Sequence, residues 1–482
     1  MAEKTISINN FQKGIGQSPY VGFEELRCLN TTDTPGVCYP NKALVKKSVA
    51  IVVDQIEGTC TNSNTLYGFS NENNIDLYKY SNPTWTELSG FDASAIRGIA
   101  FWKKFLILVH SDGDLDANDS PSTPGDWENT FDNISSGATD SSTYDVPTLI
   151  ANNNVLYFGW KNQVLNLSEV DTKTFDPSDN TTWATDVYAT LDLPEDLRIT
   201  GIAELGGNLL IATRPSGGAI NNKICYLFTW DKSSASYEQI VIQETGINYL
   251  ISTGNLAYIQ AGKEGEWYVT NGTSVEFYNK IPKALLPSNQ NIFNGACDIW
   301  RNKIYFGVSY SSTGTNLGVW SLDIRTGAIA YEYIISTGEY GQNDGVFITS
   351  ITVVNDKLVV CWYDDENSSF GSDTVGNAAD VGYSGNKSYL VSQYYQLAGA
   401  LESKASRRFD INLTKPCGAS DTVKVYYRTT QNGAFTTEIT ELAMSSGDQH
   451  KSISKALTKI KGIQFKIVLN GDAELLNFEM TI

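Results

Sequence analysis

The chain has 482 residues, a net charge of −19 and a pI of about 4.6, which excludes a general basic surface for nucleic acid. No apolar run approaches the roughly 20 residues of a membrane helix, so we expect no membrane insertion. Residues 1–7 lack the apolar stretch of a secretory signal, which predicts a soluble protein made in a cytoplasm.

The composition favours β-strands. The chain contains 26 Tyr, 19 Phe, 10 Trp and 40 Gly, and Ser, Thr and Asn tracts separate its apolar runs. Aromatic and β-branched residues suit a pleated sheet, while Gly and Asn suit the turns between strands. Only 18% of residues are charged, too few for a protein built of solvated helices. We therefore predict an all-β protein.

Residues 1–44 carry no regular pattern and predict an irregular N-terminal arm. Glycine and proline recur throughout this stretch and would break any regular element. The breakers are Gly14, Gly16, Pro19, Gly22, Pro35, Gly36 and Pro40.

A hairpin then recurs, in which an apolar strand, a short polar turn and a second apolar strand follow one another. Its six turns lie about 47 to 54 residues apart, close to the about 40 to 50 residues of a four-stranded propeller blade. The hairpins begin with Ile96–Phe101, Pro147–Ala151, Ile199–Leu205, Ile247–Thr253, Gly295–Ile299 and Phe347–Val354.

Upstream, Val49–Val53, Leu66–Ser70 and Asp76–Tyr80 resemble a degenerate first copy. We predict a β-propeller over residues 45–398 with six or seven four-stranded blades, seven being favoured. The weaker alternative is a β-sandwich with coincidental spacing, and the period-2 alternation disfavours a helical solenoid.

After residue 399 the pattern changes to short alternating strands, such as Phe409–Leu413, Thr422–Thr429 and Ile463–Val468. About 85 residues of this kind predict a small β-sandwich over residues 399–482. The division is thus an arm at 1–44, a propeller at 45–398 and a sandwich at 399–482.

The seven cysteines are scattered and form no C-x-x-C pair, so neither a zinc site nor a disulfide framework is indicated. Cys28 and Cys38 flank a Pro-Gly turn and can pair if the protein meets an oxidising medium. Whether they do is left open by the sequence.

Two stretches resemble tail proteins of tailed bacteriophages. They are residues 11–37 in the arm, with the run Phe11-Gln12-Lys13-Gly14-Ile15-Gly16-Gln17-Ser18-Pro19-Tyr20, and residues 409–428 near the C-terminus. The order of arm, propeller and sandwich is similar to the phage tail nozzle family. The resemblance implies a virion structural protein of the tail, synthesised in the host cytoplasm. It further implies subunits in a ring that lines the DNA exit channel, with DNA as a passing molecule and other tail proteins as partners.

The densest acidic loop places Asp112, Asp114 and Asp116 at alternate positions, a spacing that can gather oxygen ligands around calcium. An EF-hand would need Gly at the sixth position and Glu at the twelfth, where this chain has Ala117 and Thr123. A solvated acidic loop is the alternative to this calcium site, and we expect no other cofactor.

No catalytic motif is found. The chain has two histidines, His110 and His450, and no Gly-x-Ser-x-Gly elbow accompanies either. His110 ends an apolar strand and is expected to be structural. Two aromatic-bearing insertions, Leu115–Tyr144 with Trp127 and Phe131, and Glu366–Tyr389, could offer rings to a sugar or to another subunit.

Three functions follow as hypotheses. The leading one is a non-enzymatic tail component forming a six-fold or twelve-fold homo-oligomeric ring for DNA ejection. The second is a peripheral adhesin that binds a host-surface glycan. The third is a propeller-type polysaccharide-degrading enzyme, which needs paired carboxylates in one pocket.

Overall fold

The computed structural model consists of β-strands, turns and short 3-10 segments. It describes residues 5–15, 23–31, 33–46, 55–71, 75–81, 84–123, 126–134, 145–151, 154–170, 173–185, 191–216, 224–287, 290–310, 316–336, 345–364, 369–376, 383, 385, 387–397, 406–457 and 460–481. Within these residues, no helix has the length and apolar character needed to cross a membrane. The 3-10 segments that lie wholly within the described residues are Phe11–Lys13, Lys283–Leu285 and Thr440–Leu442.

Residues 45–375 contain sheets whose strands follow one another in simple antiparallel order, numbered here as sheets 1 to 7 along the chain. Sheets 1 to 3 contain β6 (Gly58–Asn62), β7 (Thr65–Ser70), β8 (Asp76–Ser81) and β9 (Thr84–Leu88); β10 (Ile96–Trp102), β11 (Phe105–His110), β12 (Asp114–Asn118) and β13 (Glu128–Asn133); and β14 (Thr148–Ala151), β15 (Val155–Trp160), β16 (Gln163–Glu169), β17 (Trp183–Thr185) and β18 (Leu191–Asp192).

Sheets 4 to 7 continue the same order. They contain β19 (Leu197–Leu205), β20 (Asn208–Pro215), β21 (Cys225–Trp230) and β22 (Glu238–Ile242); β23 (Ile247–Ser252), β24 (Ala257–Ala261), β25 (Glu266–Thr270) and β26 (Val275–Lys280); β27 (Cys297–Trp300), β28 (Lys303–Val308), β29 (Gly318–Asp323) and β30 (Ile329–Tyr333); and β31 (Val346–Val354), β32 (Lys357–Asp364), β33 (Ser369–Val375) and β5 (Val45–Lys46).

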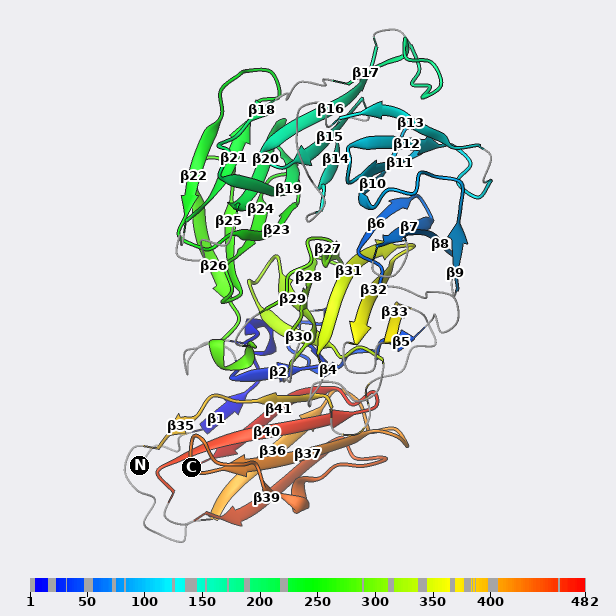
Figure 1. Ribbon diagram of the computed structural model, residues 1–482. Helices are drawn as coiled ribbons and strands as arrows, with labels where there is room; N and C mark the ends of the chain where they lie inside the picture. Colours follow the sequence, from blue (N-terminus) through cyan, green and yellow to red (C-terminus); the bar gives the residue numbers. More distant parts are fainter. Residues whose placement is uncertain are drawn as a thin grey trace.

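The first strands of these sheets form a closed cycle. Strands β6, β10, β14, β19, β23, β27 and β31 each contact the next, and β31 contacts β6 again. Figure 1 shows the sheets arranged around a common axis. The second strands are apolar on both faces, as in β11, because each sheet is covered by neighbours on both sides. The predicted all-β propeller is confirmed.

The six predicted hairpins correspond to β10–β11, β14–β15, β19–β20, β23–β24, β27–β28 and β31–β32. Their turns have the expected chemistry, since Gly206 and Gly207 have φ of 59° and 88° between β19 and β20. Seven sheets follow the pattern, which supports the favoured count. The blade number stays a prediction, and the predicted strand Val49–Val53 falls outside the described residues.

The C-terminal region contains two sheets in contact, whose strands from Ser406 onward are drawn in orange and red in Figure 1. Phe409, Phe465 and Phe478 pack together between them, with Phe465 and Phe478 ring centroids 4.9 Å apart. One sheet has the order β1 (Thr5–Ile8), β41 (Leu475–Thr481), β36 (Ser406–Leu413) and β39 (His450–Ala456); the other contains β34 (Tyr389–Val391), β35 (Tyr395–Gln396), β40 (Gly462–Asn470), β37 (Thr422–Arg428) and β38 (Thr437–Glu438).

Strand β2 (Glu25–Arg27) joins the propeller to the C-terminal sheets. It pairs in parallel with β30 of sheet 6 and antiparallel with β34, so a single sheet runs through both parts of the molecule. The Arg27 guanidinium carbon lies 5.3 Å and 5.9 Å from the ring centroids of Tyr331 and Tyr389, cation–π contacts to both sides of the junction.

The segment predicted as an irregular arm therefore contributes strands to both parts. Strand β1 pairs with β41 and β2 forms the junction, while β5, which directly follows this segment, completes sheet 7. A short pair, β3 (Leu29–Asn30) and β4 (Tyr39–Pro40), lies between them. Strands β34 and β35 precede residue 399 but pair with β40, so the C-terminal sheets use residues from both sides of the predicted boundary.

The same segment contains Cys28 and Cys38, which are buried free thiols in this structure. Burial raises the pKa of Cys28 to about 12 and that of Cys38 still further. Such thiols are poor nucleophiles at neutral pH.

A buried ion pair within sheet 6 anchors this segment through Asn41. Lys303 Nζ lies 2.9 Å from Glu332 Oε1, and both side chains are at most 3% exposed. The Ser321 hydroxyl donates to the same carboxylate at 2.7 Å, and the Asn41 amide donates to its second oxygen. The carboxylate is thus paired and hydrogen-bonded, as a buried charge requires.

Replacing Glu332 with Ala should lower the free energy of unfolding by about 3–5 kcal/mol, because it leaves the Lys303 charge buried without its partner. Denaturant unfolding would measure the loss. The exposed pair Lys283–Glu264 provides the control, and Lys283→Met should change stability by no more than about 0.5 kcal/mol. Equal effects of the two substitutions would contradict this role.

Candidate functional site: the channel mouth

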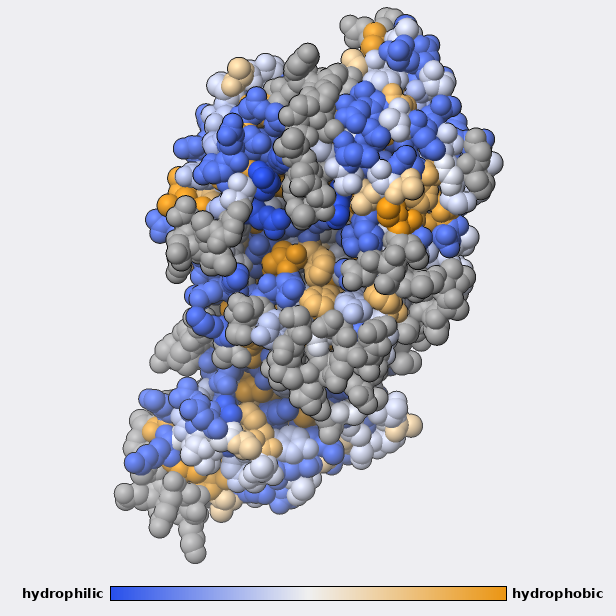
Figure 2. Space-filling view, viewed as in Figure 1, coloured by the Kyte–Doolittle hydropathy of each residue, from blue (hydrophilic) through white to orange (hydrophobic). Residues whose placement is uncertain are grey.

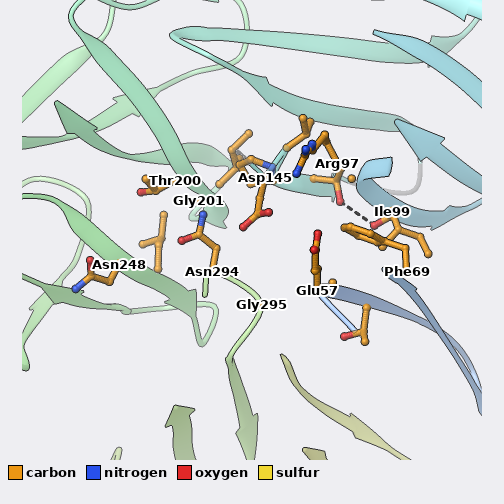
Figure 3. Close-up of a pocket in the computed structure, with 18 residues that line it drawn as sticks. Glu57, Phe69, Arg97, Ile99, Asp145, Thr200, Gly201, Asn248, Asn294 and Gly295 are labelled. Carbon is orange, nitrogen blue, oxygen red and sulfur yellow. Dashed lines mark hydrogen bonds between the residues drawn. The ribbon is translucent and has the colours of Figure 1, made fainter. Parts of the chain in front are cut away.

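A cavity of about 230 Å³ lies where the first strands converge around the propeller axis. Its lining residues come from sheets 1 to 6, mostly from the beginnings of β6, β10, β14, β19, β23 and the segment before β27. Figure 3 shows this cavity with side chains directed into it from several sheets. We call it the channel mouth.

A β-bulge recurs on the first strands near this mouth. The strand register shifts between Ile96 and Gly98 in β10, between Ile199 and Gly201 in β19, between Ile247 and Tyr249 in β23, and between Ile348 and Ser350 in β31. Each shift leaves one extra residue opposite the second strand, and a bulge re-aims such a side chain. The extra residues are all polar: Arg97, Thr200, Asn248 and Thr349.

Three of these bulge residues, Arg97, Thr200 and Asn248, line the cavity. The Thr200 hydroxyl donates to the carbonyl of Ile247 on the next sheet at 2.7 Å. Asn248 donates from its amide to the Gln260 side chain at 2.6 Å. The bulges therefore hold polar side chains in fixed positions at the mouth.

Glycine after the bulge lets neighbouring sheets approach. A Cβ on Gly98 would lie 2.8 Å from the carbonyl oxygen of Val146 on the segment entering sheet 3. That distance is shorter than real Cβ contacts allow, so a larger residue would push the two sheets apart at the axis.

Two carboxylates face the same open space. Figure 3 shows Asp145, at the entry to sheet 3, and Glu57, at the entry to sheet 1, both directed into the cavity, with Arg97 nearby. Asn71 donates to Glu57 at 2.8 Å and fixes its carboxylate. Burial raises the pKa of Asp145, while the charges of Arg97 and Arg214 act in the opposite direction. The mouth thus offers acceptors and donors with partly balanced charge.

The three predicted calcium ligands lie elsewhere, at β12 and the turn before it. Asp116 is fully buried and accepts from the backbone N–H groups of Asp92 at 2.7 Å and Thr130 at 2.8 Å. The Asn133 amide donates to Asp114 at 2.5 Å, and the Ser94 hydroxyl donates to Asp112 at 2.7 Å.

Protein donors thus occupy each of these three carboxylates. Across the described ranges, no group of three or more His, Cys, Asp or Glu side chains is placed to hold a metal ion. The calcium hypothesis gains no support from this geometry, and Asp116 instead has a structural role.

The partner of Asp116 is His110, which is also fully buried. Its Nε2 lies 3.1 Å from Asp116 Oδ2, and its Nδ1 lies 2.7 Å from the carbonyl oxygen of Ser94. Burial by itself would lower the His110 pKa, but the hydrogen bond and charge of Asp116 outweigh burial and raise it. His110 therefore links β11 to β12 and to the segment that precedes β10.

The raised pKa of His110 makes the stability of the folded chain depend on pH in a defined direction. His110 binds its proton more tightly in the folded chain, so its stabilising contribution is complete below about pH 6.5 and is lost as pH rises through the raised value. The stability difference between the wild type and His110→Gln should therefore be larger at about pH 6 than at about pH 9. His450→Gln, at an exposed position of β39, is the control. A difference that grows with pH would contradict this assignment.

The predicted aromatic insertions differ in outcome. Trp127 is 9% exposed and packs against Phe91, and Phe131 packs against Phe175 and Trp183. Neither ring is presented for stacking on a ligand. Part of the second insertion, Glu366–Tyr389, falls outside the described residues, and Tyr383 within its described part is buried.

The sequence analysis missed the channel mouth, although a signal for it was present. The first strands of four sheets share a short sequence pattern near their start. The pattern is an isoleucine, then a polar residue, then a small or aromatic residue, then an aliphatic residue. The copies are Ile96-Arg97-Gly98-Ile99, Ile199-Thr200-Gly201-Ile202, Ile247-Asn248-Tyr249-Leu250 and Ile348-Thr349-Ser350-Ile351.

Comparison with known proteins gives structural likeness alone. No family model matches the chain, and no curated protein matches it. Similar solved structures include BamB from Moraxella catarrhalis (11% identity, 78% of this chain and 99% of that chain, TM-score 0.37), Saccharomyces cerevisiae Sqt1 (11%, 74% and 92%, 0.38) and the β-propeller domain of Myceliophteria thermophila Cps50 (Swd1) (10%, 67% and 100%, 0.41). At these TM-scores the likeness carries no argument about activity or partners.

Proposed function

We propose that this chain is a non-enzymatic structural subunit of a bacteriophage tail, nozzle-like, which forms a ring around the path of ejected DNA. The observation that carries the proposal is the sheet that runs from sheet 6 through β2 into the C-terminal region. Domains of one chain usually move relative to each other unless their interface is large. Here main-chain hydrogen bonds cross the junction, and a stiff body of this kind suits a repeated structural part.

The surface charge suits a channel wall. A chain with a net charge of −19 repels the phosphate backbone, so DNA would pass without adhering to the wall. Tight DNA binding would instead need a basic surface.

The outer strands of sheets 4 and 5 offer a contact for a second copy of the chain. Val241 on β22 is 52% exposed and Phe277 on β26 is 56% exposed. Both strands end their sheets, within the described residues. Figure 2 shows a mainly hydrophilic face with small apolar groups, one of them at the rim where β22 lies. Apolar side chains on edge strands favour association between subunits.

Electron microscopy of the purified chain, together with its mass in solution, tests this proposal. We expect rings of six or twelve subunits with a central opening, and incorporation into tails when the chain is supplied to its virus. A stable monomer that joins no assembly would contradict the proposal.

The double substitution Val241→Asp and Phe277→Asp should reduce ring formation, because burying two new charges between subunits is unfavourable. Val170→Asp, which alters an exposed apolar residue next to sheet 3, serves as the matched control. Rings that form equally well with both sets of substitutions would show that subunits meet at another surface.

A further inference from the structure

The polar side chains of the channel mouth come from consecutive sheets around the axis. Glu57, Arg97, Asp145, Thr200 and Asn248 belong to sheets 1 to 5, or to the segments entering them, and Asn294 precedes sheet 6. Three of these positions, Arg97, Thr200 and Asn248, are the extra residues of bulges that shift the strand register without breaking the sheet. A convergence of polar groups at the axis, built by repeated bulges, indicates a binding site rather than a packing defect.

The size of the cavity limits the ligand. At about 230 Å³ it is smaller than the roughly 300–1,000 Å³ of pockets for drug-sized ligands. Ile99, Ile202 and Leu250 add apolar surface between the polar groups. The mouth therefore suits one small ring that carries both polar and apolar faces.

The charges of the lining side chains limit the class of ligand further. Arg97 opposes a bound metal cation, and the carboxylates of Glu57 and Asp145 oppose a phosphate or another anion. Hydroxyl groups satisfy both kinds of protein group, because each hydroxyl donates to a carboxylate and accepts from a guanidinium or an amide. A neutral polyol thus fits this set better than a charged ligand does.

We propose that the channel mouth binds a single neutral sugar ring, with Asp145 and Glu57 accepting hydrogen bonds from its hydroxyls and Arg97 and Asn294 donating to its oxygens. The apolar side chains contact the C–H face of the ring. This site is separate from the outer strands assigned to subunit contact, so neither proposal depends on the other.

Saturation-transfer NMR on the full chain tests the site, with D-glucose, D-galactose and N-acetyl-D-glucosamine as probes. We expect transfer to at least one of these sugars. Asp145→Asn and Glu57→Gln should each weaken that binding about tenfold or more, since each removes a hydrogen bond to a charged group. D-glucuronate and inorganic phosphate, as charged probes, should bind more weakly than the neutral sugar.

The control variant is Glu238→Gln, which removes an exposed carboxylate on β22, and it should leave sugar binding unchanged. Thermal unfolding of each variant establishes that the fold is kept. If a mouth variant unfolds, Asn294→Ala takes its place in the same comparison. The proposal is overturned if no neutral sugar shows transfer, if folded mouth variants bind as the wild type does, or if phosphate binds more tightly than every sugar.

Discussion

The architecture depends on main-chain pairing between the start of the chain and strands several hundred residues later. Strand β5 completes sheet 7, and β2 lies between sheet 6 and the C-terminal sheets. Closing such long loops costs chain entropy that grows only slowly with loop length. The main-chain hydrogen bonds, the hydrogen bond from Asn41 to the buried Glu332 carboxylate and the Arg27 contacts with Tyr331 and Tyr389 oppose that cost. The rest of the molecule is thereby held in one arrangement.

The axis of the propeller sets a second constraint. Seven first strands converge there, and each needs room for its neighbours. Small residues such as Gly98 allow close approach, while three of the four bulges place a polar side chain at the mouth. The start of the first strands, with its bulges and small residues, therefore allows the sheets to pack closely and also lines the cavity with polar side chains.

The sequence predicted the parts of the fold that depend on residues close together in the chain. Short apolar runs such as Phe105–His110, joined to their partners by turn residues, gave all six hairpins, because an apolar run and its turn chemistry span only a few neighbouring residues. It did not predict β2, since three residues carry no period and their partners, Tyr331 and Leu390 among them, lie far along the chain. Likewise the spacing of Asp112, Asp114 and Asp116 predicted a metal site, whereas His110 and backbone donors, brought in by the fold, engage Asp116.

The central claim is that the propeller and the C-terminal sheets form one stiff body through β2. Hydrogen exchange of the backbone amides of Leu26, Arg27 and Cys28 under native conditions measures this directly. We expect these amides to exchange only when the whole chain unfolds, with the same protection as their neighbours in β30 and β34. Rapid exchange at β2, with protection kept in both flanking strands, would show a junction that opens independently and would contradict the account.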